Sequence, residues 1–141
     1  EEAFLFYRAA RYDLHGKALL KTNPKEYIVD TGFRTWMAGY RVTDIGRLFE
    51  NAVYFQLLYE GWSVHVGKLY GKEVDFVATK DGRVLYVQAT DEMFASETRE
   101  REIAPLKAIR DNHEKIAVVR QGSYDTDIDG IRIVSARDFF L

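Results

Sequence analysis

Residues 72–90 decide the fold, and they read KEVDFVATKDGRVLYVQAT. Apolar and polar side chains alternate before and after Asp81 and Gly82, a pattern typical of strands buried on one face. Asp-Gly is a preferred pair for a two-residue β-turn. We therefore expect an antiparallel hairpin in which Lys80 lies opposite Arg83.

The register of this hairpin decides which polar side chains meet. Counting outward from the turn places Asp75 opposite Gln88 and Glu73 opposite Thr90. Because side chains alternate along a strand, these four polar residues should share one face of the sheet. The same face would carry Val77, Tyr86 and Val84, and the opposite, apolar face would carry Val74, Phe76, Ala78, Leu85, Val87 and Ala89.

The polar end of that face has two interpretations. A carboxylate facing an amide, beside a helix that carries Glu50, could hold a divalent cation such as Mg²⁺. Spacing alone favours the simpler alternative, in which Asp75 is half-buried and satisfied by its neighbours. Gln88 is then an ordinary cross-strand partner.

Further elements complete the order αβββαβ between Asp44 and Arg120. Asp44 is a suitable N-cap, apolar residues follow it at helical spacing, and Gly61 is a natural helix stop. The other elements that we expect are a strand from Trp62 to Leu69, a helix from Ser96 to Asp111 in which Pro105 predicts either a kink or a later start, strands at 115–119 and 131–134, and a short final helix capped by Ser135.

Residues 1–40 form an N-terminal unit. The segment from Phe4 to Tyr12 is aromatic and strand-like, Asp13 to Gly16 is a turn signal, and Lys25 to Asp30 indicates a second strand. A short helix is expected from Phe33 to Ala38. Two strands are too few to be stable alone, so this hairpin must pack on the core that follows or on a partner.

The composition indicates a globular chain. Its 141 residues fit one domain with a small appended element, and a hydrophobic share of 47% is ample for a core. A net charge of −2 argues against a strongly basic nucleic-acid binder. No apolar run approaches the roughly 20 residues that span a bilayer, so we expect a cytoplasmic protein. The chain begins at Glu1 without an initiator methionine, and we expect it to belong to a longer protein.

Metal sites built from cysteine or histidine are not expected. The chain has no cysteine, which excludes disulfides and thiolate ligands. His15, His65 and His113 lie far apart in the sequence and form no pair with metal-ligand spacing. We expect each to be an ordinary solvent-facing or partly packed residue.

Several segments resemble a known family. Gly46–Asn51 (GRLFEN), Lys72–Phe76 (KEVDF) and Thr98–Glu102 (TRERE) are similar to a prokaryotic domain of unknown function, which is related to the PD-(D/E)XK nuclease superfamily. That domain typically follows an AAA+-type ATPase module and a winged helix in the same polypeptide. The segment Tyr27–Gly32 (YIVDTG) is similar to the sequence that enters it.

The resemblance implies an α/β fold with a restriction-endonuclease-like αβββαβ core. A central mixed sheet flanked by helices would occupy residues 41–141. Residues 1–40 would then be the N-terminal β-hairpin extension, as the tail of a winged-helix region.

The resemblance also implies a candidate catalytic site. Glu50 matches the helix glutamate, Asp75 the metal-binding aspartate, and Gln88 and Thr90 the Glu-x-Lys pair. Glu50, Asp75 and Gln88 would then hold Mg²⁺. However, Gln88 contributes no negative charge, and Thr90 cannot replace a lysine that orients water or stabilises the transition state. A nuclease-like fold is therefore better supported than nuclease activity.

Three hypotheses follow for the function. The leading one is a catalytically degenerate nuclease-like domain that serves in recognition or regulation within an AAA+-type ATP-binding protein, with the ATPase portion, DNA or another protein as partner. The alternative is an active Mg²⁺-dependent DNA or RNA nuclease in which Lys68, Lys72 or Arg99 replaces the missing lysine. The third is an oligomerisation domain that assembles through the aromatic segment from Phe4 to Tyr12.

Overall fold

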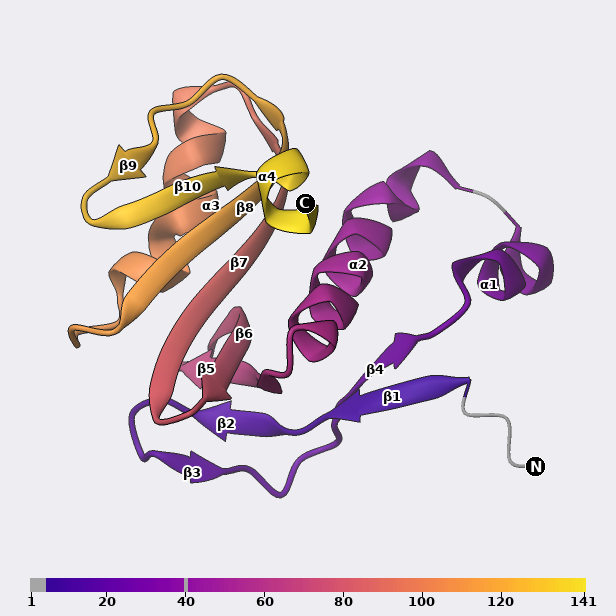
Figure 1. Ribbon diagram of the computed structural model, residues 1–141, viewed down its shortest axis with the longest axis horizontal. Helices are drawn as coiled ribbons and strands as arrows, with labels where there is room; N and C mark the ends of the chain where they lie inside the picture. Colours follow the sequence, from indigo (N-terminus) through magenta and orange to yellow (C-terminus); the bar gives the residue numbers. More distant parts are fainter. Residues whose placement is uncertain (1–4, 40) are drawn as a thin grey trace.

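The computed structural model describes residues 5–39 and 41–141 and shows an α/β fold (Figure 1). Its centre follows the expected order of helix, three strands, helix and strand. These elements are α2 (Ile45–Tyr59), β5 (Ser63–Leu69), β6 (Lys72–Lys80), β7 (Arg83–Met93), α3 (Ser96–Lys107) and β8 (Glu114–Gly122).

Shorter elements flank this centre. Before it come β1 (Phe6–Ala9), β2 (Arg11–Asp13), β3 (Ala18–Leu19), β4 (Lys25–Ile28), α1 (Thr31–Ala38) and a 3₁₀ turn (Val42–Asp44). After it come β9 (Asp127–Ile128), β10 (Ile131–Ser135) and α4 (Ala136–Phe140). Ser135 caps α4 as expected, because its side chain accepts a hydrogen bond from the Asp138 N–H.

The central sheet is mixed and includes part of the N-terminal unit. Its strand order is β3-β2-β5-β6-β7-β8-β10-β9, with β2 parallel to β5 and β8 parallel to β7 and β10. β1 and β4 form a separate two-stranded antiparallel sheet, and Tyr7 packs edge-on against Phe55 of α2 at a centroid distance of 5.4 Å. The N-terminal unit thus packs on the core that follows it. Phe4, part of the expected first strand, lies outside the described residues.

The expected β6–β7 hairpin is confirmed near its turn. Asp81 and Gly82 both have left-handed backbones, with φ of 49° and 75°, as a two-residue turn of this kind requires. Backbone pairing starts with Lys80 opposite Arg83, as counted from the sequence, and continues as far as Phe76.

A β-bulge in β6 overturns the expected alternation beyond that point. Between two regular stretches of the β5–β6 ladder, Asp75 and Phe76 together face the single residue Val66. Because of the extra residue, the side chains of the preceding part of β6 point to the faces opposite to those that regular alternation predicts. Val74 therefore packs with Val77 in one core, and Phe76 packs in the other, although strict alternation predicted that Val74 and Phe76 share a face.

The bulge also separates the four polar residues that were expected on one face. Glu73 and Asp75 turn towards α2, where Glu50 lies. Gln88 and Thr90 turn towards α3, because the alternate residues of β7 pack against α2. The expectation of a shared face is therefore wrong, and the cause is one additional residue in β6.

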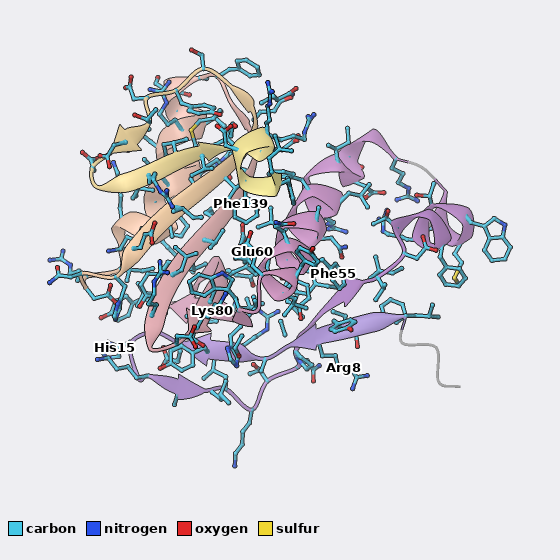
Figure 2. All side chains as sticks on the ribbon, in the orientation of Figure 1. Arg8, His15, Phe55, Glu60, Lys80 and Phe139 are labelled. Atoms are coloured by element: carbon cyan, nitrogen blue, oxygen red, sulfur yellow. The ribbon has the colours of Figure 1, made fainter. Side chains whose placement is uncertain are left out.

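Each face of the sheet has its own apolar core. α2 and α4 cover one face, and Phe55 and Phe139, labelled in Figure 2, pack against the core on this side. α3 covers part of the other face through its buried residues Ile103 and Leu106. None of the helices within residues 5–39 and 41–141 has the length and apolarity needed to span a bilayer.

The helix boundaries agree with the sequence at α2 and differ at α3. α2 begins directly after Asp44 and stops before Gly61, whose φ of 85° is the left-handed value common after a helix. α3 ends at Lys107 rather than at Asp111. Pro105 lies in its last turn, and the helix begins at Ser96, so the later start that Pro105 suggested does not occur.

Asn51 joins the N-terminal unit to α2. Its side-chain oxygen accepts from the Ile28 N–H at 2.9 Å, and its amide nitrogen donates to the Ile28 carbonyl at 2.8 Å. Asn51 is buried, and its side chain pairs both the backbone N–H and the carbonyl of Ile28.

We expect Asn51→Ala to lower the free energy of unfolding by roughly 2 kcal/mol, because it leaves two partly buried backbone groups unpaired. Urea unfolding of the whole chain measures this loss. Asn112→Ala, at an exposed loop position, is the matched control. Equal losses in the two variants would show that the contact does not hold β4.

Candidate acidic site beside α2

The candidate site lies where three elements meet on the α2 face of the sheet. α2 supplies Glu50, β6 supplies Glu73 and Asp75, and β4 supplies Lys25 and Tyr27. Strand alternation places Lys25 and Tyr27 on the same side of β4, and the bulge brings Asp75 onto the side of Glu50.

Lys25 is the centre of this cluster. Its Nζ lies 2.6 Å from Glu50 Oε1 and 2.7 Å from Glu73 Oε1, and its side chain is 27% exposed. Tyr27 Oη donates to the same Glu50 oxygen at 2.9 Å. Burial alone would lower the pKa of Lys25, but the charge of Glu50 and hydrogen bonds to both glutamates raise it above its ordinary value. Lys25 is therefore a permanent cation.

Glu73 is held by three cations. Arg11 Nη1 donates to Glu73 Oε2 at 2.7 Å, and Lys68 Nζ lies 3.3 Å from the same oxygen. Burial alone would raise the pKa of Glu73, but the hydrogen bonds from Lys25 and Arg11 lower it to about 2. Glu73 is thus ionised across the physiological range.

Asp75 is in a different electrostatic position. Its Oδ2 accepts from the Ala89 N–H at 2.8 Å, the main interaction that favours its charged form. Burial, followed by the negative charge of Glu50, raises the pKa of Asp75 to about 7. Asp75 is therefore the carboxyl group of the cluster that can hold a proton near neutral pH.

The other two predicted site residues do not join this cluster. Gln88 Oε1 accepts from the Asp75 N–H at 3.2 Å, so its carbonyl oxygen continues the strand pairing where the backbone ladder has ended. Thr90 is buried on the α3 side of β7, and its hydroxyl has no hydrogen-bond partner among the described residues. The structure brings Glu50 and Asp75 together and leaves Thr90 on the opposite face.

Two lysines lie beside the carboxylates of the cluster, and of these Lys68 was among the residues proposed to replace the missing lysine, whereas Lys25 was not. Lys68 contacts Glu73, whereas Lys72 is exposed and Arg99 reaches the Ser123 carbonyl from α3. Lys25 was missed because it belongs to the N-terminal unit. A signal was present, since a charged residue two positions before Tyr27 in a short strand shares its inward face.

The donor set does not fit a Mg²⁺ ion in this arrangement. Magnesium requires oxygen ligands in octahedral geometry, most of them free to point at the ion. Glu50 Oε1 is engaged by Lys25 and Tyr27, and the Gln88 oxygen by a backbone N–H. Within residues 5–39 and 41–141, no group of three or more histidine, cysteine, aspartate or glutamate side chains is arranged to hold a metal ion.

The raised pKa of Asp75 predicts a pH dependence of stability. A carboxyl group with a higher pKa in the folded state stabilises the fold at low pH, and this contribution is lost as the pH rises through about 7. Asp75→Asn retains the acceptor oxygen and cannot ionise. Between about pH 5 and about pH 8, we expect the variant to gain roughly 2 kcal/mol relative to the native chain in urea unfolding.

Asp125→Asn, at an exposed position before β9, controls for the loss of one negative charge. If both variants follow the same pH dependence as the native chain, Asp75 does not titrate in this range.

Comparison with known proteins finds one informative relative. No protein-family model matches the chain, and no solved structure matches it at a significant level. An uncharacterized protein of Haemophilus influenzae is 43% identical over 141 residues, which is 100% of this chain and 34% of that protein. The chain thus spans about a third of the length of the curated relative that it matches.

Proposed function

We propose that this chain is a nuclease-like domain that does not cleave nucleic acid and serves in recognition or regulation. The observation that carries the proposal is Lys25, whose ammonium lies between Glu50 and Glu73 at 2.6 and 2.7 Å. In a metal-dependent nuclease the positive charge beside the carboxylates at the positions of Glu50 and Asp75 is a divalent cation. Here the chain supplies that charge itself.

The departure from the nuclease pattern concerns both the cation of the site and the two β7 positions. A lysine ammonium neutralises carboxylates but cannot act as a Lewis acid or lower the pKa of a bound water molecule, as a metal ion does. Gln88 and Thr90, at the Glu-x-Lys positions of β7, turn towards α3 and supply neither a carboxylate nor an ammonium group to the cluster. The ion pairs instead stabilise the contact between β4 and the core.

We propose that the domain belongs to a longer cytoplasmic protein with an AAA+-type ATP-binding portion, and that this portion is its main partner. Two observations support a partner within the same polypeptide. The Haemophilus relative extends well beyond the matched region. The N-terminal unit also presents large apolar side chains to solvent, with Trp36 80% and Met37 67% exposed. DNA or a second protein remains the alternative partner.

The active-nuclease alternative uses the same lysine differently. Lys25 would be the relocated catalytic lysine, and its contact with Glu50 is the observation in its favour. A metal ion would then have to displace the ammonium from the carboxylates. The two proposals therefore make opposite predictions for the removal of Lys25.

We expect no cleavage of single- or double-stranded DNA or RNA by the native chain in millimolar Mg²⁺ or Mn²⁺. Lys25→Met removes the internal cation and leaves Glu50 and Glu73 without it. We expect this variant to gain saturable Mn²⁺ binding in calorimetry and a higher melting temperature with Mn²⁺ than without it, because a bound ligand stabilises the folded state.

Lys72→Met is the matched control, since Lys72 is exposed in the same sheet and forms no ion pair within the described residues. It should behave like the native chain with Mn²⁺. The proposal is overturned if the native chain cleaves nucleic acid in a metal-dependent manner and both Lys25→Met and Asp75→Asn abolish that cleavage.

A further inference from the structure

A second site lies on the opposite face of the sheet, beside α3. A cavity of about 660 Å³ opens there between the β2–β3 hairpin and the segment that connects α3 to β8. Figure 1 shows these two segments at the same end of the sheet. The acidic cluster lies on the α2 face, so the two sites share no side chain.

The cavity exists because α3 covers only part of this face. α3 packs on β6, β7 and β10, and it ends at Lys107. Towards β5 and β2 the inward-facing side chains of the sheet are not covered by that helix, and they form the floor of the cavity. The end of α3 at Lys107 therefore leaves this part of the face open.

Aromatic and imidazole rings form the walls. All three histidines of the chain line this cavity, although they lie far apart in the sequence, and each stands beside a tyrosine ring. Figure 2 shows His15 at the outer end of the β2–β3 hairpin. The pairs are His15 with Tyr70 at a centroid distance of 5.0 Å, Tyr12 with His65 at 6.4 Å, and Tyr86 with His113 at 6.1 Å.

The floor between these rings is apolar. Leu69, Val77 and Ile109 are buried there, and they offer contact area without hydrogen bonds. Burial lowers the pKa of His65 below its usual value, so its imidazole is neutral at physiological pH. A neutral ring can stack on an aromatic ligand and still donate or accept one hydrogen bond at its edge.

The rim of the cavity carries positive charge. Lys17 and Arg110 are exposed there, and neither forms an ion pair within residues 5–39 and 41–141. The one acid in the lining, Asp111, accepts a hydrogen bond from Tyr86 Oη at 2.7 Å and lies 3.8 Å from Lys115 Nζ. The two rim cations are thus available to an anion.

We propose that this cavity binds a nucleotide, with the base against the tyrosine and histidine rings and the phosphate at Lys17 and Arg110. Cavities of roughly 300–1,000 Å³ with apolar, aromatic walls and a few polar groups are typical of small-molecule sites. Every nucleobase has a π-face, so aromatic stacking recognises the class, and guanidinium and ammonium groups recognise the phosphate. This inference does not depend on the proposed function of the acidic cluster.

The histidines provide a direct assay. Because the chain has only three, and all line the cavity, their imidazole C–H signals in proton–carbon NMR report on its occupancy. The probes are the four common nucleoside 5′-monophosphates, the matching nucleosides, and a 5′-phosphorylated single-stranded octanucleotide. We expect saturable shifts of the histidine signals with at least one monophosphate. If the octanucleotide binds ten times more tightly than the monophosphates, the natural ligand is the phosphorylated end of a nucleic-acid strand and not a free nucleotide.

Two variants distinguish recognition of the base from recognition of the phosphate. Arg110→Ala should weaken monophosphate binding about tenfold and leave nucleoside binding within about twofold, because a charge-assisted contact is lost. Tyr70→Ala, at an exposed ring, should weaken both ligands. Arg47→Ala, on α2, is the control and should change neither.

Histidine signals that do not move with any probe at millimolar concentration would overturn the proposal. Monophosphate binding that Arg110→Ala and Tyr70→Ala leave unchanged would also overturn it. So would nucleosides that bind as tightly as the monophosphates, since phosphate recognition would then be absent.

Discussion

The contact of Lys25 with Glu50 and Glu73 is the interaction on which the account of this protein depends. It joins β4, α2 and β6, three elements far apart in the sequence. Lys25 Nζ lies 2.6 Å from Glu50 Oε1 and 2.7 Å from Glu73 Oε1. Partly buried charges of this kind stabilise a fold only when each has a well-placed partner, and breaking one partner leaves the other uncompensated. The same contact determines the chemistry of the site. It places a cation between two carboxylates without a metal ion, while burial and the charge of Glu50 raise the pKa of Asp75.

A single extra residue in β6 explains why the molecule has two unlike faces. The bulge opposite Val66 turns Glu73 and Asp75 towards α2 and leaves the rest of the hairpin in its regular register. The acidic cluster therefore forms on the α2 side. On the other side, α3 is too short to cover the sheet as far as β2, and a cavity with aromatic walls remains. Bulges often occur beside functional sites because they redirect a side chain without disrupting the sheet.

Local signals in the sequence predicted most of the central fold. The Asp81-Gly82 pair specified the turn and the register near it, and the apolar spacing before Gly61 specified α2. Both depend on backbone preferences of adjacent residues, which a sequence displays directly. The bulge was not predictable in this way, because Asp75 and Phe76 fit a regular strand equally well. The ion pairs of Lys25 and the shared cavity of the three histidines were missed for another reason. Their neighbours come from segments far away in the chain, and only the folded sheet brings them together.

The most direct test of the central claim is a double-mutant cycle between Lys25→Met and Glu50→Gln, with the free energy of unfolding measured for all four proteins. If the ammonium of Lys25 is the internal cation of the site, the two substitutions should be coupled by at least about 1 kcal/mol, because either one removes the same interaction. Effects that add to within about 0.5 kcal/mol would show that the two residues are independent. That result would contradict the central claim, since the Lys25 ammonium would then not act as the internal cation of the acidic cluster.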